Sequence, residues 1–305
     1  MDLRTLRAFV EVVRQGGFSA AAKSLNSTQP TVSKSVRQLE DEIGAPLLDR
    51  LGHRIHPTAA GEMVYRRAIA MLTERESLQA ELADLRGLKR GRLKLGLSRI
   101  GSSVLFAPLF ALYRSRYPGI EIKLIEHGSL QLEQLVEAGE LELGVSLLPV
   151  PDGFDWQLVR DDPLMALLPA GHPLEGRDKV RLVELADSPF IMFESGFALN
   201  PLIEEACRKR GFTPHAAARS GQADFILALV AAGLGVALLP KLILENRVKS
   251  PITCALLDEE DLRWRAALAW RQGSQLSPPA RAWLDLAREV LKPDPVPQSP
   301  VLPSA

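Results

Sequence analysis

Residues 18–61 read FSAAAKSLNSTQPTVSKSVRQLEDEIGAPLLDRLGHRIHPTAAG, and this stretch decides the fold of the N-terminal part of the chain. Ser19 is a candidate N-cap for an alanine-rich helix that runs to about Leu25. The next three residues, Asn-Ser-Thr, favour a turn because their side chains bond nearby backbone groups. Thr28 is placed to cap a second helix, and Pro30 falls in its first turn, where a missing N–H is tolerated. These signals predict two helices joined by a tight turn.

The second helix has one apolar and one polar face. Steps of four, three and four residues place a buried stripe on one side: Val32, Val36, Leu39 and Ile43. The opposite face carries Thr31, Ser33, Lys34 and Arg37. Short hydroxyls near the start of a helix, followed by cations, suit a helix that enters the major groove of DNA.

The flanking segments complete a small helical domain. Upstream, a supporting helix is marked by Leu3, Leu6, Phe9, Val10 and Val13. Downstream, residues 50–57 predict a basic hairpin, or wing, from which Arg50, His53, Arg54 and His56 reach phosphates. A polar helix face alone is more often merely solvated. The ordered combination of short helix, three-residue turn, proline-started helix and basic wing is what favours DNA binding.

This segment resembles the DNA-binding domain of LysR-type transcriptional regulators, a winged helix-turn-helix family. The resemblance is carried by Phe18-Ser19-x-Ala21-Ala22, Leu25, Thr28-Gln29-Pro30-Thr31-Val32-Ser33, Gln38-Leu39-Glu40, Gly44-x-Pro46-Leu47, Arg50 and Thr58-x-Ala60-Gly61. Ser27, Leu48 and Pro57 depart from the usual family residues. The resemblance implies that Gln29, Pro30, Thr31, Ser33, Lys34 and Arg37 face the groove and that Arg50 and Arg54 support the wing. With Ser19, Thr28 and His53 these form the predicted DNA-binding set.

Composition sets limits on the whole chain. Its 305 residues suffice for one small and one large domain, and the overall formal charge is zero. Residues 1–90 hold 14 Lys/Arg against 11 Asp/Glu, so DNA affinity is expected to need paired domains rather than bulk charge. The two cysteines, Cys207 and Cys254, have no metal-like spacing and are expected to be unpaired thiols. With no leader or membrane span expected, we predict a soluble cytoplasmic protein without a metal or cofactor.

A long helical pattern runs from Ala59 to about Leu88 and would extend roughly 45 Å. Apolar residues repeat along it every seven residues, with one interleaved: Val64, Met71, Leu78, Leu85 and Leu82. Such a seam is typical of a helix that pairs with a partner helix, which predicts a homodimer and two inverted half-sites on DNA. The alternative is a helix packed on its own domain.

Beyond residue 90, strand-like and helical runs alternate in the rhythm of an open α/β sheet. We expect strands at 92–98, 120–126, 141–146, 164–169, 190–193, 235–239 and 265–271, and helices at 103–115, 129–138, 201–210, 223–232 and 279–291. Two such sets with two crossings resemble the periplasmic-binding-protein-like effector domain of the same family. The predicted divisions are a DNA-binding domain (1–58), a linker helix and hinge (59–90), an effector domain (91–292) and a disordered proline-rich tail (293–305). Within the effector domain, lobe I covers about 91–161 and 266–292, and lobe II about 162–265.

Ligands of open α/β sheets bind where strands end, near helix N-termini that favour anions. On that basis the predicted effector site contains Ser98, Arg99, Gly101, Ser102, Ser103, His127, Ser129, Ser146, Ser195, Phe197 and Gln222. Ser102, Ser103 and Ser129 are equally suited to helix capping, Arg99 to a solvated position and His127 to an ordinary surface role. We predict a small carboxylate-bearing effector that meets the loop of residues 98–103.

The sequence contains no complete nucleophile elbow, dinucleotide loop, P-loop or zinc-protease motif, so we predict that the chain is not an enzyme. The expected function is that of a ligand-responsive transcription factor. It would bind promoter DNA as a dimer or tetramer and change the DNA bend or the contact with RNA polymerase. The competing interpretations are a small-molecule-binding α/β protein or enzyme with an incidental helical domain, and a DNA-binding architectural protein without a ligand.

Overall fold

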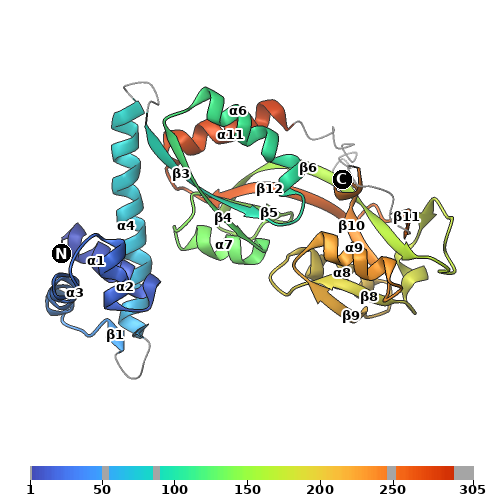
Figure 1. Cartoon of the computed structure of the whole chain (residues 1–305), viewed down its shortest axis with the longest axis horizontal. Helices are drawn as coiled ribbons and strands as arrows, with labels where there is room; N and C mark the ends of the chain where they lie inside the picture. Colours follow the sequence, from blue (N-terminus) through green and yellow to red (C-terminus); the bar gives the residue numbers. More distant parts are fainter. Residues whose placement is uncertain (1, 50–54, 85–89, 246–251, 292–305) are drawn as a thin grey trace, which may run out of the picture. The chain divides into compact units, whose positions relative to one another are not determined.

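The computed structural model of the chain describes residues 2–49, 55–84, 90–245 and 252–291. The chain forms two compact units (Figure 1). The first unit contains the chain up to residue 86 together with residues 138–140, and the second contains the remainder. Among the described residues, no helix is long and apolar enough to cross a membrane.

The first unit is helical. Its elements are α1 (Leu3–Gln15), α2 (Phe18–Ser24), α3 (Gln29–Ile43), β1 (Leu48–Asp49), β2 (His56–Pro57) and α4 (Ala59–Asp84). Phe9, Val36 and Leu39 are completely buried at the centre of its core. Glu40 joins α3 to the following turn, because its carboxylate accepts hydrogen bonds from the backbone N–H groups of Leu47 (2.9 Å) and Leu48 (3.3 Å). The predicted helix–turn–helix order is therefore present.

Two local expectations were wrong. Gly17, not Ser19, occupies the N-cap of α2, and Ser19 lies inside that helix. Ser19 therefore cannot cap it. Leu3 and Ile43 are 40% and 36% exposed although both follow the apolar period. They lie at the outer ends of α1 and α3, where the helix extends past the core that its middle covers.

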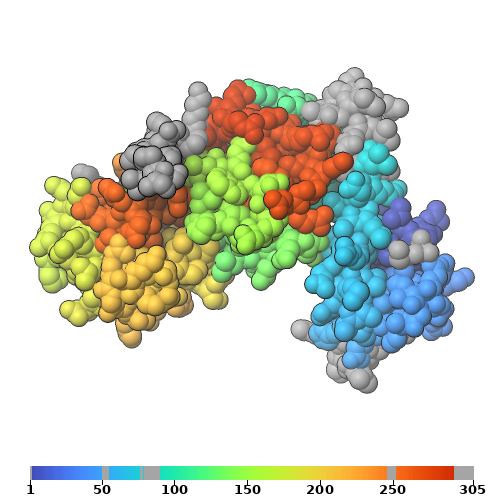
Figure 2. Space-filling model, turned by 180° about the vertical axis from the view of Figure 1, so that it is seen from behind, coloured from blue at the N-terminus to red at the C-terminus, as the bar shows by residue number. Residues whose placement is uncertain are grey.

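The long helix α4 is described over 26 residues, or about 39 Å, and its expected end near Leu88 lies outside the described residues. Its first turns pack on the core of their own unit through Ala68 and Ile69, and Val64 is half-buried there. Val64 is thus partly covered by the core of its own unit, and its expected contact with a partner helix stays a prediction. Farther along, Met71 and Leu78 are 45% and 55% exposed, and α4 lies at the surface in Figure 2. The Leu82 side chain and Leu85 lie outside the described residues.

The second unit is an α/β structure. Its elements, in chain order, are β3 (Gly91–Ser98), α5 (Ser102–Leu105), α6 (Ala107–Arg116), β4 (Ile120–His127), α7 (Ser129–Glu137), β5 (Leu143–Leu147), β6 (Phe154–Pro169), β7 (Lys179–Val180), the 3-10 helix η1 (Leu182–Leu185), β8 (Pro189–Phe193), α8 (Leu199–Lys209), β9 (His215–Ser220), α9 (Ala223–Ala231), β10 (Ala237–Pro240), α10 (Lys241–Leu244), β11 (Ile252–Leu257), β12 (Arg263–Arg271) and α11 (Pro278–Val290).

One sheet runs in the order β4-β3-β5-β12-β6-β11-β7, and β10 also pairs with β6. β3 is parallel to β4 and β5, whereas β12 is antiparallel to β5 and β6. α6 and α11 cover one face of the first-lobe part of this sheet and α7 covers the other (Figure 1). β8 and β9 form a second, parallel pair in the other lobe. This is the predicted two-lobed α/β architecture.

One long strand, β6, runs from the first lobe into the second. The first half of β6 pairs with β12, while its second half pairs with β10 and β11. The expected strand at 164–169 is therefore the end of a continuous strand rather than a separate one. A similar correction applies to the helix expected at 103–115, which is interrupted at Phe106 between α5 and α6. Pro108 lies in the first turn of α6, where its ring prevents the preceding helix from continuing.

Candidate DNA-binding surface and interlobe site

The start of α3 has the expected backbone geometry but lacks the expected side-chain cap. Thr28 is its N-cap residue in extended conformation, and a proline occupies its first turn. The Thr28 hydroxyl shares a hydrogen bond of 2.8 Å with the Thr31 hydroxyl and bonds no backbone N–H of the helix. The first-turn N–H groups of α3 therefore receive no side-chain cap from Thr28.

One face of α3 is free of the core. Val32, Val36 and Leu39 are buried, while five of the predicted groove-facing residues are exposed: Gln29, Pro30, Thr31, Lys34 and Arg37. Ser33 is half-buried at the edge of this face, and Ser19 is exposed on α2. Within the described part of the chain, neither Lys34 nor Arg37 forms a salt bridge. A face with amide, hydroxyl and two unpaired cations can contact both base edges and phosphates.

The hairpin after α3 is anchored by β1 and β2, whose antiparallel register pairs Leu48 with Pro57 and Asp49 with His56. His56 is exposed. The remaining wing residues predicted to bind DNA, Arg50, His53 and Arg54, lie outside the described residues.

In the second unit, the loop between β3 and α5 is held by its own serines. The Ser98 hydroxyl accepts a hydrogen bond from the Ile100 N–H (3.3 Å), and the Ser102 hydroxyl donates to the Ser98 carbonyl. Both serines are buried, whereas Arg99 and Ser103 are exposed. Gly101, with φ of 76°, precedes α5, and this helix has only four residues. The anion-binding role expected of a long helix beginning here is weakened, because one turn supplies little helix dipole.

Direct hydrogen bonds join the lobes at the start of α7. The Leu130 N–H donates to the Gly196 carbonyl (3.2 Å), and the Ala198 N–H donates to the Ser129 hydroxyl (3.0 Å). The approach is close, since a Cβ on Gly128 would lie 2.1 Å from the Gly196 oxygen. The structure thus brings predicted residues of the loop after β4 together with the loop after β8.

Arg99 lies near the second lobe as well. A Cβ placed on Gly221 would lie 3.0 Å from a carboxylate oxygen of Glu194 and 3.4 Å from the Arg99 guanidinium. Three loops that follow β3, β8 and β9 therefore meet here. Gln222, at the N-cap of α9, and Ser195 are exposed beside them, and His127 is half-buried at the end of β4.

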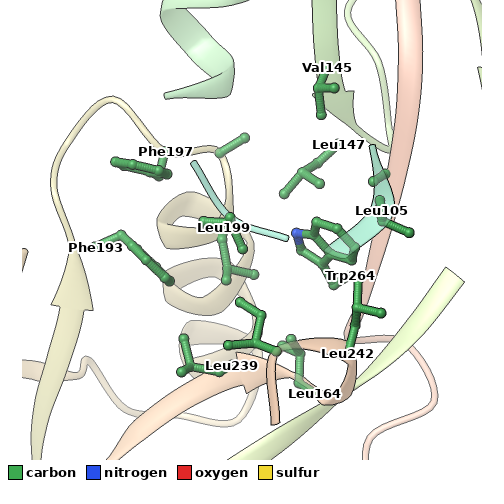
Figure 3. Close-up of a cluster of buried hydrophobic side chains, with 14 of the residues drawn as sticks. Leu105, Val145, Leu147, Leu164, Phe193, Phe197, Leu199, Leu239, Leu242 and Trp264 are labelled. Atoms are coloured by element: carbon green, nitrogen blue, oxygen red, sulfur yellow. The ribbon is translucent and has the colours of Figure 1, made fainter. Parts of the chain in front are cut away.

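The interlobe region has a large apolar component that sequence reasoning missed. Figure 3 shows Leu105 and Leu147 of the first lobe facing Leu199, Leu239 and Leu242 of the second, with Trp264 of β12 beside them. Trp264 is 1% exposed, and a Cβ on Gly101 would lie 2.9 Å from its ring. Phe197 stacks near Phe193 with ring centroids 5.0 Å apart. The strand period of β12 indicates that Trp264 is buried, but not that it reaches this loop.

Ser146 is completely buried on β5 and its hydroxyl donates to the carboxylate of Glu133 on α7. Burial raises the pKa of Glu133 above its ordinary value. This pair is an internal contact of the first lobe. Cys207 and Cys254 are both free thiols, as predicted, and burial raises the pKa of Cys207 to about 11, so it is protonated at neutral pH.

Two family models match this chain. Residues 3–62 match the bacterial regulatory helix-turn-helix protein model of the lysR family, and residues 86–292 match the LysR substrate binding domain. The chain belongs to the LysR family. It is 35% identical over 292 residues to the HTH-type transcriptional regulator YwbI of Bacillus subtilis, covering 95% of this chain and 97% of that protein.

Solved structures of this family share the fold of the regulator. A full-length OxyR variant from Pseudomonas aeruginosa superposes with a TM-score of 0.77 at 24% identity, covering 94% of this chain and 95% of that one. CbnR complexed with its target DNA superposes with a TM-score of 0.64 at 21% identity, covering 95% of this chain and 100% of that one. The two family models and the relative at 35% identity show that the chain is a DNA-binding transcriptional regulator with an effector-binding domain, and not an enzyme. The predicted family, fold and function are confirmed.

Proposed function

We propose that this regulator binds inverted half-sites in promoter DNA through the exposed face of α3, as a dimer or as a tetramer of two dimers. The observation that carries the proposal is the α3 face itself, on which Gln29, Lys34 and Arg37 are exposed opposite a fully buried stripe. The exposed Met71 and Leu78 on α4 support pairing of two chains through that helix. It acts in the cytoplasm, where a bacterial promoter lies.

We further propose that the effector is a small organic anion bound between the lobes. Its carboxylate would meet the Arg99 guanidinium and the Ser103 hydroxyl, because the hydroxyls of Ser98 and Ser102 are used inside the loop. The adjacent Glu194 carboxylate disfavours a dianion, since Arg99 supplies only one positive charge. The apolar residues around Trp264 would meet the remainder of the molecule.

The effector would act by changing the hydrogen bonds that join Ser129 and Leu130 to the loop after β8. A ligand shifts such an equilibrium only as far as it prefers one lobe arrangement over the other. A changed arrangement in each subunit would alter the spacing of the DNA-binding units and hence the DNA bend or the contact with RNA polymerase.

Binding to the DNA upstream of the chain's own gene, measured by fluorescence anisotropy against random competitor, tests the DNA part. Ser33→Ala is expected to reduce discrimination at particular bases by about 1–3 kcal/mol. Arg37→Gln should lower the affinity for all DNA sequences alike and reduce the slope of log K against log salt by about 0.9 per subunit. Wild-type protein that binds promoter and random DNA equally at low salt would refute the proposal. For the effector, thermal shifts with organic acids should disappear in Arg99→Gln, and stabilisation only by neutral analogues would exclude an anion.

A further inference from the structure

A hollow of about 390 Å³ opens on the first unit beside α3. It lies between the start of α1, the turn that joins α2 to α3, and one side of α3. Its lining is Arg4, Arg7, Ala8, Ser24, Leu25, Asn26, Ser27, Thr31, Val32 and Ser35. Helix α3 thus has a recess along its flank in addition to the exposed face already described.

The hollow carries positive charge. Arg4 and Arg7 lie one turn apart on α1, both are exposed, and neither forms an ion pair within the described part of the chain. The lining contains no carboxylate. The two nearby acids are engaged elsewhere: Asp2 accepts from the Arg4 backbone N–H (2.6 Å), and Glu11 accepts from the hydroxyl of Ser24 (2.6 Å). Two unpaired guanidinium groups on a neutral polar wall suit an anion.

The wall opposite the arginines is neutral and polar. The Ser35 hydroxyl donates to the Thr31 carbonyl (3.0 Å) and keeps its lone pairs free to accept. Asn26 holds the turn in a left-handed conformation with φ of 49°, and Ser27 follows it in an exposed position. A sugar–phosphate segment can be accommodated against such a surface without burying an unpaired charge of the protein.

The position of the hollow beside α3 indicates which anion it binds. Thr31 belongs both to the hollow and to the α3 face proposed to enter the DNA groove. A helix seated in a major groove about 12 Å wide has a phosphate backbone along each flank. Contacts to phosphates position a protein on the duplex and carry no sequence information. We propose that the hollow seats a phosphate of the operator backbone, held by Arg4 and Arg7; this inference rests on the proposed DNA-binding role of α3.

The test uses the full-length chain and the promoter fragment. Replacing both arginines, R4Q with R7Q, is expected to lower the affinity for promoter DNA and the affinity for random DNA by the same factor. It should also reduce the slope of log K against log salt by about 0.9 per DNA-binding unit, or about 1.8 per dimer, because one phosphate is neutralised in each unit. The matched control removes two exposed arginines of β12 in the other unit, Arg265→Gln with Arg271→Gln, and is expected to leave the slope unchanged.

Because Arg4 and Arg7 are exposed, the unfolding midpoint of the double variant should equal that of the wild type. A second variant, Ser27→Glu, keeps both arginines and adds a carboxylate to the hollow, and it should weaken all DNA sequences. If both variants are folded and bind with wild-type affinity and slope while the wild type still selects the promoter, the hollow proposal is overturned and the DNA-binding role stands. If the wild type shows no promoter preference, the DNA-binding role itself fails.

The phosphate can be located directly. Uncharged methylphosphonate groups can be introduced one at a time along the operator. Substitution at one flanking position per half-site should lower the affinity of the wild-type protein for the operator. Substitution at that position should not lower the affinity of the double variant any further, as expected from a double-mutant cycle. Equal additional losses in both proteins at every position would contradict the assignment. Inorganic phosphate that raises the melting temperature only of the wild type, with no change in DNA binding between the two proteins, would assign the hollow to a free anion instead.

Discussion

Gly128 is a glycine of the second unit where an added methyl group is expected to disrupt the contact between the lobes. Its Cβ would lie 2.1 Å from the Gly196 carbonyl oxygen and 2.5 Å from the carbonyl carbon. Ordinary contact requires about 1 Å more than this. Both neighbours are backbone atoms, so Gly128→Ala is expected to force the loops of the two lobes apart.

The separation breaks the hydrogen bonds from the Leu130 N–H to the Gly196 carbonyl and from the Ala198 N–H to the Ser129 hydroxyl. At about 0.5–1.5 kcal/mol each, their loss lowers the free energy of unfolding by about 1–3 kcal/mol. With an m-value of about 2 kcal/mol/M, the urea midpoint should fall by about 0.5–1.5 M. Tryptophan fluorescence reports on this unit alone, because all four tryptophans lie in it: Trp156, Trp264, Trp270 and Trp283.

The matched control is Gly196→Ala, on the other side of the same contact. A Cβ there would meet nothing within 4 Å, so the substitution should be neutral or slightly stabilising by about 0.4–1 kcal/mol. Equal urea midpoints for Gly128→Ala, Gly196→Ala and the wild type would refute the close approach of the two lobes and the coupling built on it.

Two further perturbations test other parts of the regulator. Met71→Glu with Leu78→Glu places charges on the exposed row of α4 and should weaken dimerisation by about 10²–10⁴-fold. Full burial of such a side chain contributes about 1.5–3 kcal/mol, and about half of each is still exposed, so the two side chains from each of two subunits together contribute about 3–6 kcal/mol. Analytical sedimentation measures the dimer dissociation constant. The control is Met63→Glu, because Met63 is 62% exposed on a neighbouring row of α4. If all variants dissociate equally, Met71 and Leu78 do not form the dimer contact. Burial raises the pKa of Glu142 although the backbone N–H groups of Ser277 and Lys94 donate to it. An acid with a raised folded pKa favours folding only while protonated, so its contribution falls as the pH rises from about 4.3 through the folded pKa. Glu142→Gln should therefore remove part of the fall in the urea midpoint as the pH rises above about 4.3. An unchanged pH profile in that variant would contradict the assignment.

Elements with local signals could be predicted from the amino-acid sequence alone. The bounds of α3 follow from Pro30 in its first turn, the apolar period through Val32, Val36 and Leu39, and Gly44 after its end. The alternation of strands and helices beyond residue 90 likewise predicts two α/β lobes, because period and length are properties of short segments. The family resemblance rests on the same local motifs.

The packing partner of each buried face became known from the three-dimensional structure and not from the sequence. The structure placed Val64 on the core of its own unit, Trp264 against Gly101, and Gly128 against the carbonyl of Gly196. It also brought Arg4 and Arg7 beside the turn before α3 to form a charged hollow. A hydrophobic period in the sequence predicts that a side chain is buried. Because the hydrophobic effect is non-directional, the period does not predict which residues the side chain packs against. Partners far apart in the chain are therefore chosen by the packing of the complete fold.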